Sequence, residues 1–92
     1  MTQRMAQAAM IVNQKGLHAR ASRKLAETAL RFRAAMWVRR EEETVDASSL
    51  MDLMMLGAGI GSEVEIIAEG EDAAEAIAAV LQLIANKFGE ED

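Results

Sequence analysis

The chain has 92 residues, 51% of them hydrophobic, and a formal net charge of −5. This length predicts one domain over residues 1–92 with a single modest core. The absence of cysteine excludes disulfides and thiolate metal sites, and one histidine is too few for zinc, so we expect no metal and no cofactor. Apolar runs are too short to cross a membrane, and we expect a cytoplasmic monomer without a membrane partner.

Charge is divided unevenly along the chain. Residues 1–40 hold nine of the ten Lys and Arg side chains and one acid, whereas residues 41–92 hold one base and fourteen acids. Either the two halves interleave and neutralise each other, or a basic patch near Arg20, Arg23 and Lys24 attracts an acidic partner or a phosphate. Nucleic acid is not an expected partner, because the chain is acidic and has only three aromatic side chains for stacking.

The first half of the chain predicts a strand, a helix and a hairpin. The apolar run 6–12, bounded by polar residues and Gly16, predicts a strand followed by a loop. Helical spacing of apolar side chains predicts a helix over 19–33. Residues 34–38 and 44–46 flank a charged bend and predict two short strands joined by a hairpin turn.

The second half predicts a short helix, a strand and a long helix. Residues 48–56 are rich in Met and Leu, and Ser49 and Asp52 have the spacing of a capping box, in which each side chain accepts the other's backbone N–H. Alternation over 63–69 predicts a strand with one wet face, and 71–88 predicts an amphipathic helix. This order of elements favours an α+β fold, with helices on one face of a mostly antiparallel sheet.

The only histidine, His18, directly precedes the first predicted helix, where Ser, Thr, Asp or Asn is the usual cap. Neutral imidazole is a nucleophile near neutral pH. The free amides of Ala19, Arg20 and Ala21 are placed to bind a phosphoryl group, and the Arg20 guanidinium offers a planar fork to its oxygens. The pattern favours phosphoryl carriage, and the alternative is an ordinary surface histidine.

Other chemistries fit the sequence less well. The serines show no spacing typical of a Ser-His-Asp triad. The glycine-rich segment 57–61 lacks the lysine of a phosphate-binding P-loop, which favours a turn before the next strand.

The motif Gly16-Leu17-His18-Ala19-Arg20 is followed about thirty residues later by Ser49-Leu50-Met51 and a short Leu/Met helix that ends at Gly57. This pairing resembles the HPr family, the phosphocarrier proteins of the bacterial phosphoenolpyruvate-dependent phosphotransferase system. The resemblance covers about residues 5–88. It implies an open-faced β-sandwich, with four antiparallel strands and three helices on one face, and a phosphoryl carrier rather than an enzyme.

The resemblance also implies roles for individual residues. His18 would accept phosphate on Nδ1 from phosphorylated enzyme I and pass it to an enzyme IIA-type domain, and Arg20 would stabilise the phosphohistidine. Ser49 matches the serine that a dedicated HPr kinase/phosphorylase modifies in many members. The apolar face of the short helix would join the first helix in docking partners, and it comprises Leu50, Met51 and Met54.

The sequence departs from the family pattern at two positions. Ala21 stands where the family usually has proline, which restores a backbone donor in the first turn. Asp52 stands where glycine is expected and would repel a phosphate on Ser49.

Several alternatives remain open from the sequence. Ser49 is a regulatory phosphosite or a plain helix cap, and the methionines of the short helix are docking residues or core filler. The carrier could serve sugar transport or nitrogen and carbon regulation. The competing function is a non-catalytic regulatory binding module that acts through the helix Ser49–Met55.

Overall fold

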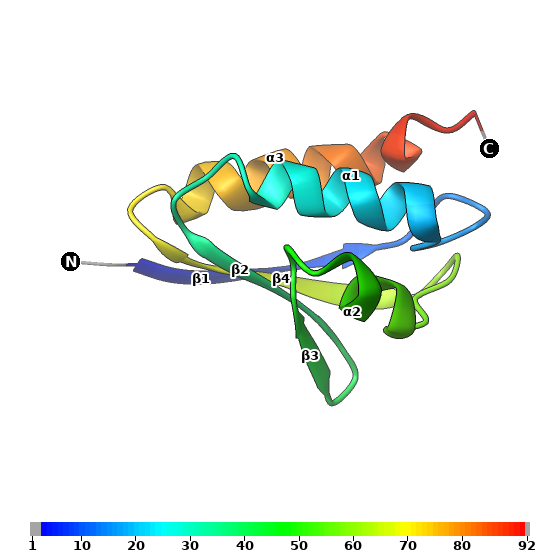
Figure 1. Cartoon of the computed structure of the whole chain (residues 1–92), viewed down its shortest axis with the longest axis horizontal. Helices are drawn as coiled ribbons and strands as arrows, with labels where there is room; N and C mark the ends of the chain where they lie inside the picture. Colours follow the sequence, from blue (N-terminus) through cyan, green and yellow to red (C-terminus); the bar gives the residue numbers. More distant parts are fainter. Residues whose placement is uncertain (1–2, 92) are drawn as a thin grey trace.

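One antiparallel sheet of four strands forms the floor of the molecule in a computed structural model, which describes residues 3–91 (Figure 1). The strand order across the sheet is β1-β4-β2-β3. The strands are β1 (Gln3–Met10), β2 (Ala35–Arg40), β3 (Glu43–Asp46) and β4 (Glu63–Gly70). Both β1 and β2 pair with β4, so the first and last strands of the chain are neighbours.

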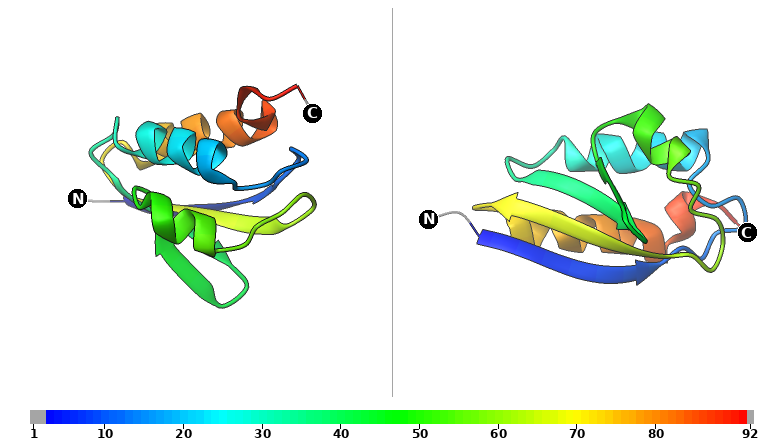
Figure 2. Two further views of the ribbon diagram at one scale, coloured as in Figure 1. Left: turned by 45° about the vertical axis from the view of Figure 1, so that its right-hand side comes forward. Right: turned by 90° about the horizontal axis from the view of Figure 1, so that it is seen from below.

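Helices α1 (Ala19–Ala29) and α3 (Ala73–Ala85) lie side by side across one face of the sheet (Figures 1 and 2). The short helix α2 (Leu50–Met55) packs against α1 and β3. This arrangement confirms the predicted α+β fold and open-faced sandwich. Within residues 3–91, none of the helices combines the length and apolarity that crossing a bilayer requires.

The core lies between the sheet and the helices that cover it. Alternate side chains of β4 face this layer, as expected for a half-covered strand. The largest fully buried side chains of the core come from strands, loops, all three helices and the turn after α3. The hydrophobic ones are Phe88, Ile11, Leu25, Leu53, Ile66, Val38 and Val80. Because α1 is packed through this core, the loop that precedes it has a defined position.

The opposite face of the sheet is open and carries charge pairs. Arg4 pairs with Glu69 at 3.2 Å, and Arg39 pairs with Glu65 at 2.9 Å. The Arg4 guanidinium also lies 5.5 Å from the ring centre of Trp37. Each ion pair joins a base from the first half of the chain to an acid from the second half, so the two halves interleave in charge as well as in structure.

The first helix is shorter than the predicted helix over 19–33. It ends at Ala29, and the amides of Arg33 and Ala34 donate to the Asp72 carboxylate at 2.9 and 2.8 Å. Those amides are therefore unavailable for helical bonds, and Asp72 ties the start of α3 to the α1–β2 connection.

The last helix is also shorter than the predicted helix over 71–88. It ends at Ala85, and the next residues form a single turn at Lys87–Gly89. Lys87 and Phe88 both have left-handed backbone angles, with φ of 57° and 56°. The kink turns the Phe88 side chain into the core, where it is fully buried.

Strand boundaries differ by a few residues from those predicted. β1 occupies residues 3–10 rather than 6–12, because its pairing with β4 begins at Gln3 opposite Gly70 and ends at Met10 opposite Glu63. β2 continues to Arg40, so the charged bend contracts to a tight turn.

Only half of the predicted capping box forms at the start of α2. The Ser49 hydroxyl accepts the Asp52 N–H at 3.4 Å, as predicted. The Ser49 N–H, however, donates to Asp46 O at 3.1 Å. The preceding turn has taken the donor that the Asp52 carboxylate was expected to bind, so that part of the prediction is wrong.

Candidate functional site

The loop before α1 is held in place by close backbone contacts. Gly16 has φ of 65°, and a Cβ there would lie 2.4 Å from Ala58 O, so only glycine fits. Leu17 is buried, and its N–H donates to the same carbonyl at 2.9 Å. The Asn13 side chain, fully buried, donates to Gly16 O at 2.9 Å. These contacts fix the position of His18.

His18 is the N-cap of α1, as the sequence predicts. Its backbone is extended, its carbonyl accepts the Ser22 N–H at 2.8 Å, and its Nδ1 accepts the Arg20 N–H at 3.3 Å. The Nδ1 contact is longer than a usual N–H hydrogen bond, so little hydrogen-bond energy is lost when the contact breaks. The Nδ1 lone pair therefore points at the amides of the first helical turn, which have no intrahelical partner.

The other ring nitrogen of His18 faces a carboxylate from the far end of the chain. Nε2 makes a hydrogen bond to Glu90 Oε2, and the second oxygen of that carboxylate accepts from Asn13 Nδ2 at 3.1 Å. The side chains of His18 and Glu90 are 28% and 16% exposed to solvent. Glu90 thus bridges the histidine ring to the buried loop.

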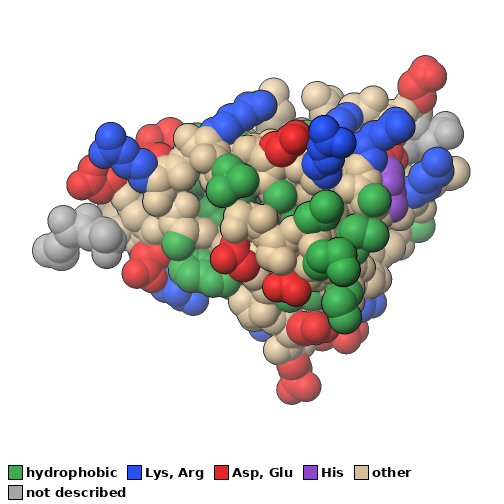
Figure 3. Space-filling model, in the orientation of Figure 1, with side chains coloured by type: hydrophobic (Ala, Val, Ile, Leu, Met, Phe, Trp, Pro, Cys, Tyr) green, Lys and Arg blue, Asp and Glu red, His purple; other side chains and the backbone are tan. Residues whose placement is uncertain are grey.

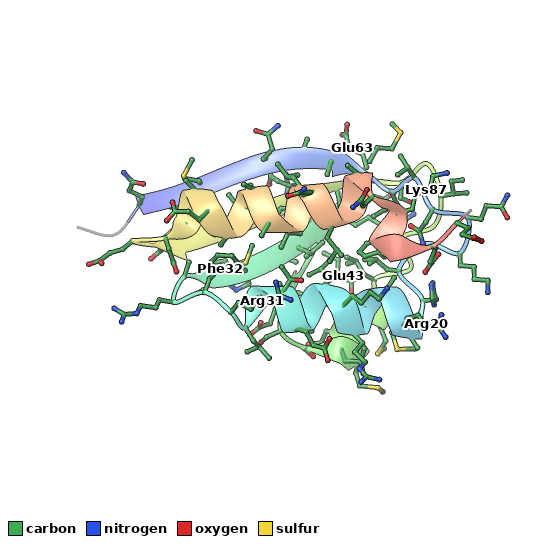
Figure 4. The ribbon with its side chains drawn as sticks, turned by 90° about the horizontal axis from the view of Figure 1, so that it is seen from above. Arg20, Arg31, Phe32, Glu43, Glu63 and Lys87 are labelled. Atoms are coloured by element: carbon green, nitrogen blue, oxygen red, sulfur yellow. The ribbon has the colours of Figure 1, made fainter. Side chains whose placement is uncertain are left out.

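The turn after α3 brings Glu90 to this position. Phe88 is anchored in the core, and its carbonyl accepts the Lys24 ammonium of α1 at 2.6 Å. Gly89 follows with φ of 79° and directs the chain back across the start of α1. In Figure 4, Lys87 and Arg20 lie at the same end of the molecule.

The environment of Glu90 keeps its carboxylate ionised. Burial alone would raise the pKa of the Glu90 carboxyl. The hydrogen bonds from His18 and Asn13, together with the nearby charge of Lys15, outweigh burial and lower that pKa below its ordinary value.

An open hollow of about 610 Å³ surrounds the histidine. It is lined by residues of the β1–α1 loop, the first turn of α1 and the C-terminal turn, namely Gln14, Lys15, His18, Ala19, Arg20, Gly89, Glu90 and Glu91. Figure 3 shows Lys and Arg side chains around the only histidine of the chain. The site therefore combines a ring nitrogen, free amides and positive charge, which suit an anion attached to His18.

Comparison with known proteins gives a consistent result. The family model described as "PTS HPr component phosphorylation site" matches residues 5–86. This chain belongs to the HPr family. HPr proteins are phosphocarriers of the phosphotransferase system rather than catalytic enzymes, and they work there with enzyme I and enzyme IIA.

Individual HPr relatives and structures show the same coverage. The phosphocarrier protein HPr of Cupriavidus necator is 51% identical over 80 residues, which is 87% of this chain and 90% of that protein. The phosphocarrier protein NPr of Shewanella violacea is 39% identical over 80 residues, which is 87% of this chain and 88% of that protein. A crystal structure of HPr from Thermoanaerobacter tengcongensis superposes with a TM-score of 0.91 at 41% identity, covering 96% of this chain and 99% of that one.

The second HPr motif lies on α2 and outside the hollow around His18. Ser49 is half-buried at the N-cap of this helix. Met51 and Met55 are 67% and 74% exposed, and Leu53 alone in the helix is buried. The core-filler interpretation of the methionines is therefore wrong, because a single turn and a half presents one face to α1 and the others to solvent.

The sequence predicted His18, Arg20 and the amides of Ala19 and Ala21 as one cluster, and the structure places them together in the first turn of α1. Sequence reasoning missed Glu90 and Asn13. Asn13 carries no signal beyond a polar loop residue before the histidine motif, and Glu90 is one acid among several at the end of the chain.

Proposed function

We propose that this protein carries a phosphoryl group on Nδ1 of His18, which it accepts from phosphorylated enzyme I and passes to an enzyme IIA-type protein. The observation that supports this proposal is the orientation of the ring. Nδ1 faces the amide of Arg20, whereas Nε2 faces the Glu90 carboxylate. An incoming phosphoryl group is favoured at the helix N-terminus and disfavoured beside a carboxylate.

Backbone amides and one guanidinium would bind the transferred group. Ala19 and Arg20 are exposed, so their amides are accessible to phosphate oxygens, and the amide of Arg20 is released when Nδ1 gives up its lone pair. Ala21 is fully buried, which restricts its amide to a phosphate oxygen that lies directly over the helix end. The Arg20 guanidinium lines the hollow and would pair with an outer oxygen.

The apolar surface beside this site suits protein partners. Leu50, Met51 and Met54 are all exposed on α2, which packs next to α1. Exposed methionines adapt to more than one partner surface. We propose that this face and the first turn of α1 together dock enzyme I and the IIA-type acceptor.

Ser49 is proposed as a secondary, regulatory phosphosite for an HPr kinase/phosphorylase. Its hydroxyl binds the Asp52 amide, so modification would remove a helix cap. Asp52 lies in the same turn and would oppose the added charge.

The decisive test is transfer of phosphate from phosphoenolpyruvate through enzyme I. Wild-type protein should take up acid-labile phosphate, and His18→Ala should take up none because the nucleophile is gone. Ser49→Ala serves as the control and should remain a full acceptor. Nitrogen-15 spectra should assign the phosphate to Nδ1. Wild-type protein that stays unmodified would remove the carrier proposal and favour a binding module that acts through α2.

The branch of the phosphotransferase system is open to the same kind of assay. Relatives named HPr and a relative named NPr both match this chain. Phosphorylated protein can be offered in competition to a sugar-specific IIA domain and to a nitrogen-regulatory IIA domain. The faster acceptor identifies the role, either in sugar transport or in nitrogen and carbon regulation.

A further inference from the structure

The contact between His18 and Glu90 joins two side chains that are each held in place by buried neighbours. Glu90 is held from both sides: Phe88, two residues before it, is fully buried, and its own carboxylate accepts from the buried Asn13 side chain. Asn13 is itself bonded to the carbonyl of Gly16 in the loop that precedes the histidine. The carboxylate therefore has a defined position relative to the ring.

The two ring contacts of His18 require the same tautomer. Nδ1 accepts a hydrogen bond from the Arg20 N–H, so it carries no proton. Nε2 faces a carboxylate oxygen, which only accepts, so Nε2 carries the proton. The neutral ring is thus held with its lone pair on the nitrogen that faces the helix amides. A histidine whose second nitrogen is bound by a carboxylate is fixed in both tautomer and ring orientation.

We propose that Glu90 is a positioning residue for phosphoryl transfer: it holds His18 in the Nε2–H tautomer and offsets the positive charge of the phosphorylated ring. This inference rests on the proposed function, because it assigns a role in the reaction at Nδ1.

The transfer step balances without a separate base. The Nδ1 lone pair forms the new P–N bond, while the bond from phosphorus to the donor breaks and its electron pair stays with the donor. The Nε2 proton remains on the ring, which gains a formal positive charge next to the Glu90 carboxylate. On transfer to the acceptor, the P–Nδ1 electron pair returns to Nδ1 and the neutral ring is restored.

The charged residues around the ring agree with Nδ1 as the reacting nitrogen and Nε2 as the nitrogen bound by Glu90. Lys15 and Arg20 line the hollow with positive charge, and the carboxylates of Glu90 and Glu91 line it as well. Glu90 alone of the two carboxylates contacts the ring among the described residues. An opposite charge at hydrogen-bond distance favours the charged form of a ring, and here the phosphorylated ring is the charged form. The carboxylate thus acts on the product of the first transfer.

Three variants separate orientation from charge. Glu90→Ala removes both effects, and Glu90→Gln keeps a hydrogen-bond acceptor without the charge. Glu75→Gln is the matched control at an exposed carboxylate on α3 that does not line the hollow. Each is phosphorylated with phosphoramidate, a small donor that needs no protein partner, and separately through enzyme I. Circular dichroism spectra and thermal melts identify any variant that fails to fold.

Phosphorylation rates and ring spectra provide independent readouts. With phosphoramidate, we expect Glu90→Ala and Glu90→Gln to react more slowly, by about 10-fold for the loss of a charge-assisted hydrogen bond, and Glu75→Gln to react as wild type. Nitrogen-15 spectra of the unphosphorylated ring should show the Nε2–H tautomer in wild type and Glu90→Gln, and a mixture in Glu90→Ala. Unchanged rates and unchanged tautomer in folded Glu90→Ala would overturn the inference.

The two donors distinguish this inference from the proposed function. If wild-type protein reacts with phosphoramidate but takes nothing from enzyme I, the partner assignment fails and the Glu90 comparison still stands. If it reacts with neither donor, the carrier function fails, and this inference fails with it.

Discussion

Helices α1 and α2 both begin with a side chain that caps the helix, but they differ in the acidic residues of their first turns. His18 caps the first through Nδ1 and the Arg20 N–H at 3.3 Å, and Ser49 caps the second through its hydroxyl and the Asp52 N–H at 3.4 Å. The first turn of α1 contains no acid, whereas that of α2 contains Asp52. Both helix N-termini carry free amides, and we propose that the local charge decides which of them favours a phosphate.

The two caps also differ in what holds them in place. His18 is anchored on its far side by Glu90, from a turn that packs into the core. Ser49 is held by its neighbour in sequence, since its N–H bonds to Asp46 O. The proposed nucleophile needs an oriented ring, and we infer that the remote anchor supplies that orientation. A helix cap needs only the local turn.

The largest effect on the α1 site short of removing its nucleophile is expected from Arg20→Ala. The substitution removes the guanidinium that would pair with the phosphate, so the transfer rate from enzyme I should fall about 10- to 100-fold, as for loss of a hydrogen bond to a charged group. Arg31→Ala, at an exposed arginine after the far end of α1, is the matched control and should transfer normally. A collapsed circular dichroism spectrum for Arg20→Ala would show instead that Arg20 is structural.

A smaller effect is expected when the charge at the α2 site is removed. Asp52→Asn should make Ser49 a better substrate for an HPr kinase with ATP, by a few-fold, because one like charge leaves the helix turn. Glu75→Gln on α3 is the control for a general change of net charge. Equal modification of Asp52→Asn and wild type would show that local charge does not separate the two caps.

The cap at Ser49 should contribute modestly to stability. Ser49→Ala removes the acceptor of the Asp52 N–H and should lower the free energy of unfolding by about 1 kcal/mol. Urea denaturation followed by circular dichroism measures the difference, with Thr44→Ala as a control at an exposed hydroxyl outside the helices. A denaturation midpoint identical to wild type would mean that Ser49 is not a cap.

The smallest expected effect is a change in acid sensitivity near α2. The pKa of Asp46 is lowered below 3.8 by hydrogen bonds from the Ser48 hydroxyl and amide, which outweigh its slight burial. A carboxyl with a lowered folded pKa stabilises the protein above its unfolded pKa, and this stability is lost as pH falls through the folded pKa. Melting temperatures of Asp46→Asn should therefore fall less steeply below pH 4 than those of wild type. Parallel curves would contradict the assignment.

Much of the fold could be predicted from the sequence, because its elements have clear local patterns. Alternation in β4, helical spacing in α1 and the break at Gly16 each depend on residues within one turn or one strand. Element ends were predicted less well. The first helix ends at Ala29, where the chain tightens so that the amide of Arg31 bonds only three residues back. Asp72, from the start of α3, then accepts the amides of Arg33 and Ala34, and no local pattern carries that contact.

The sequence by itself determined that His18 precedes the first helical turn, because a helix N-terminus presents free amides to whatever residue caps it. The tertiary structure alone decided what faces the other side of the ring. Glu90 lies 72 residues from His18 and meets it only because Phe88 enters the core through a left-handed turn. Such a contact depends on packing between distant segments, and the periodicity of either segment contains no record of it.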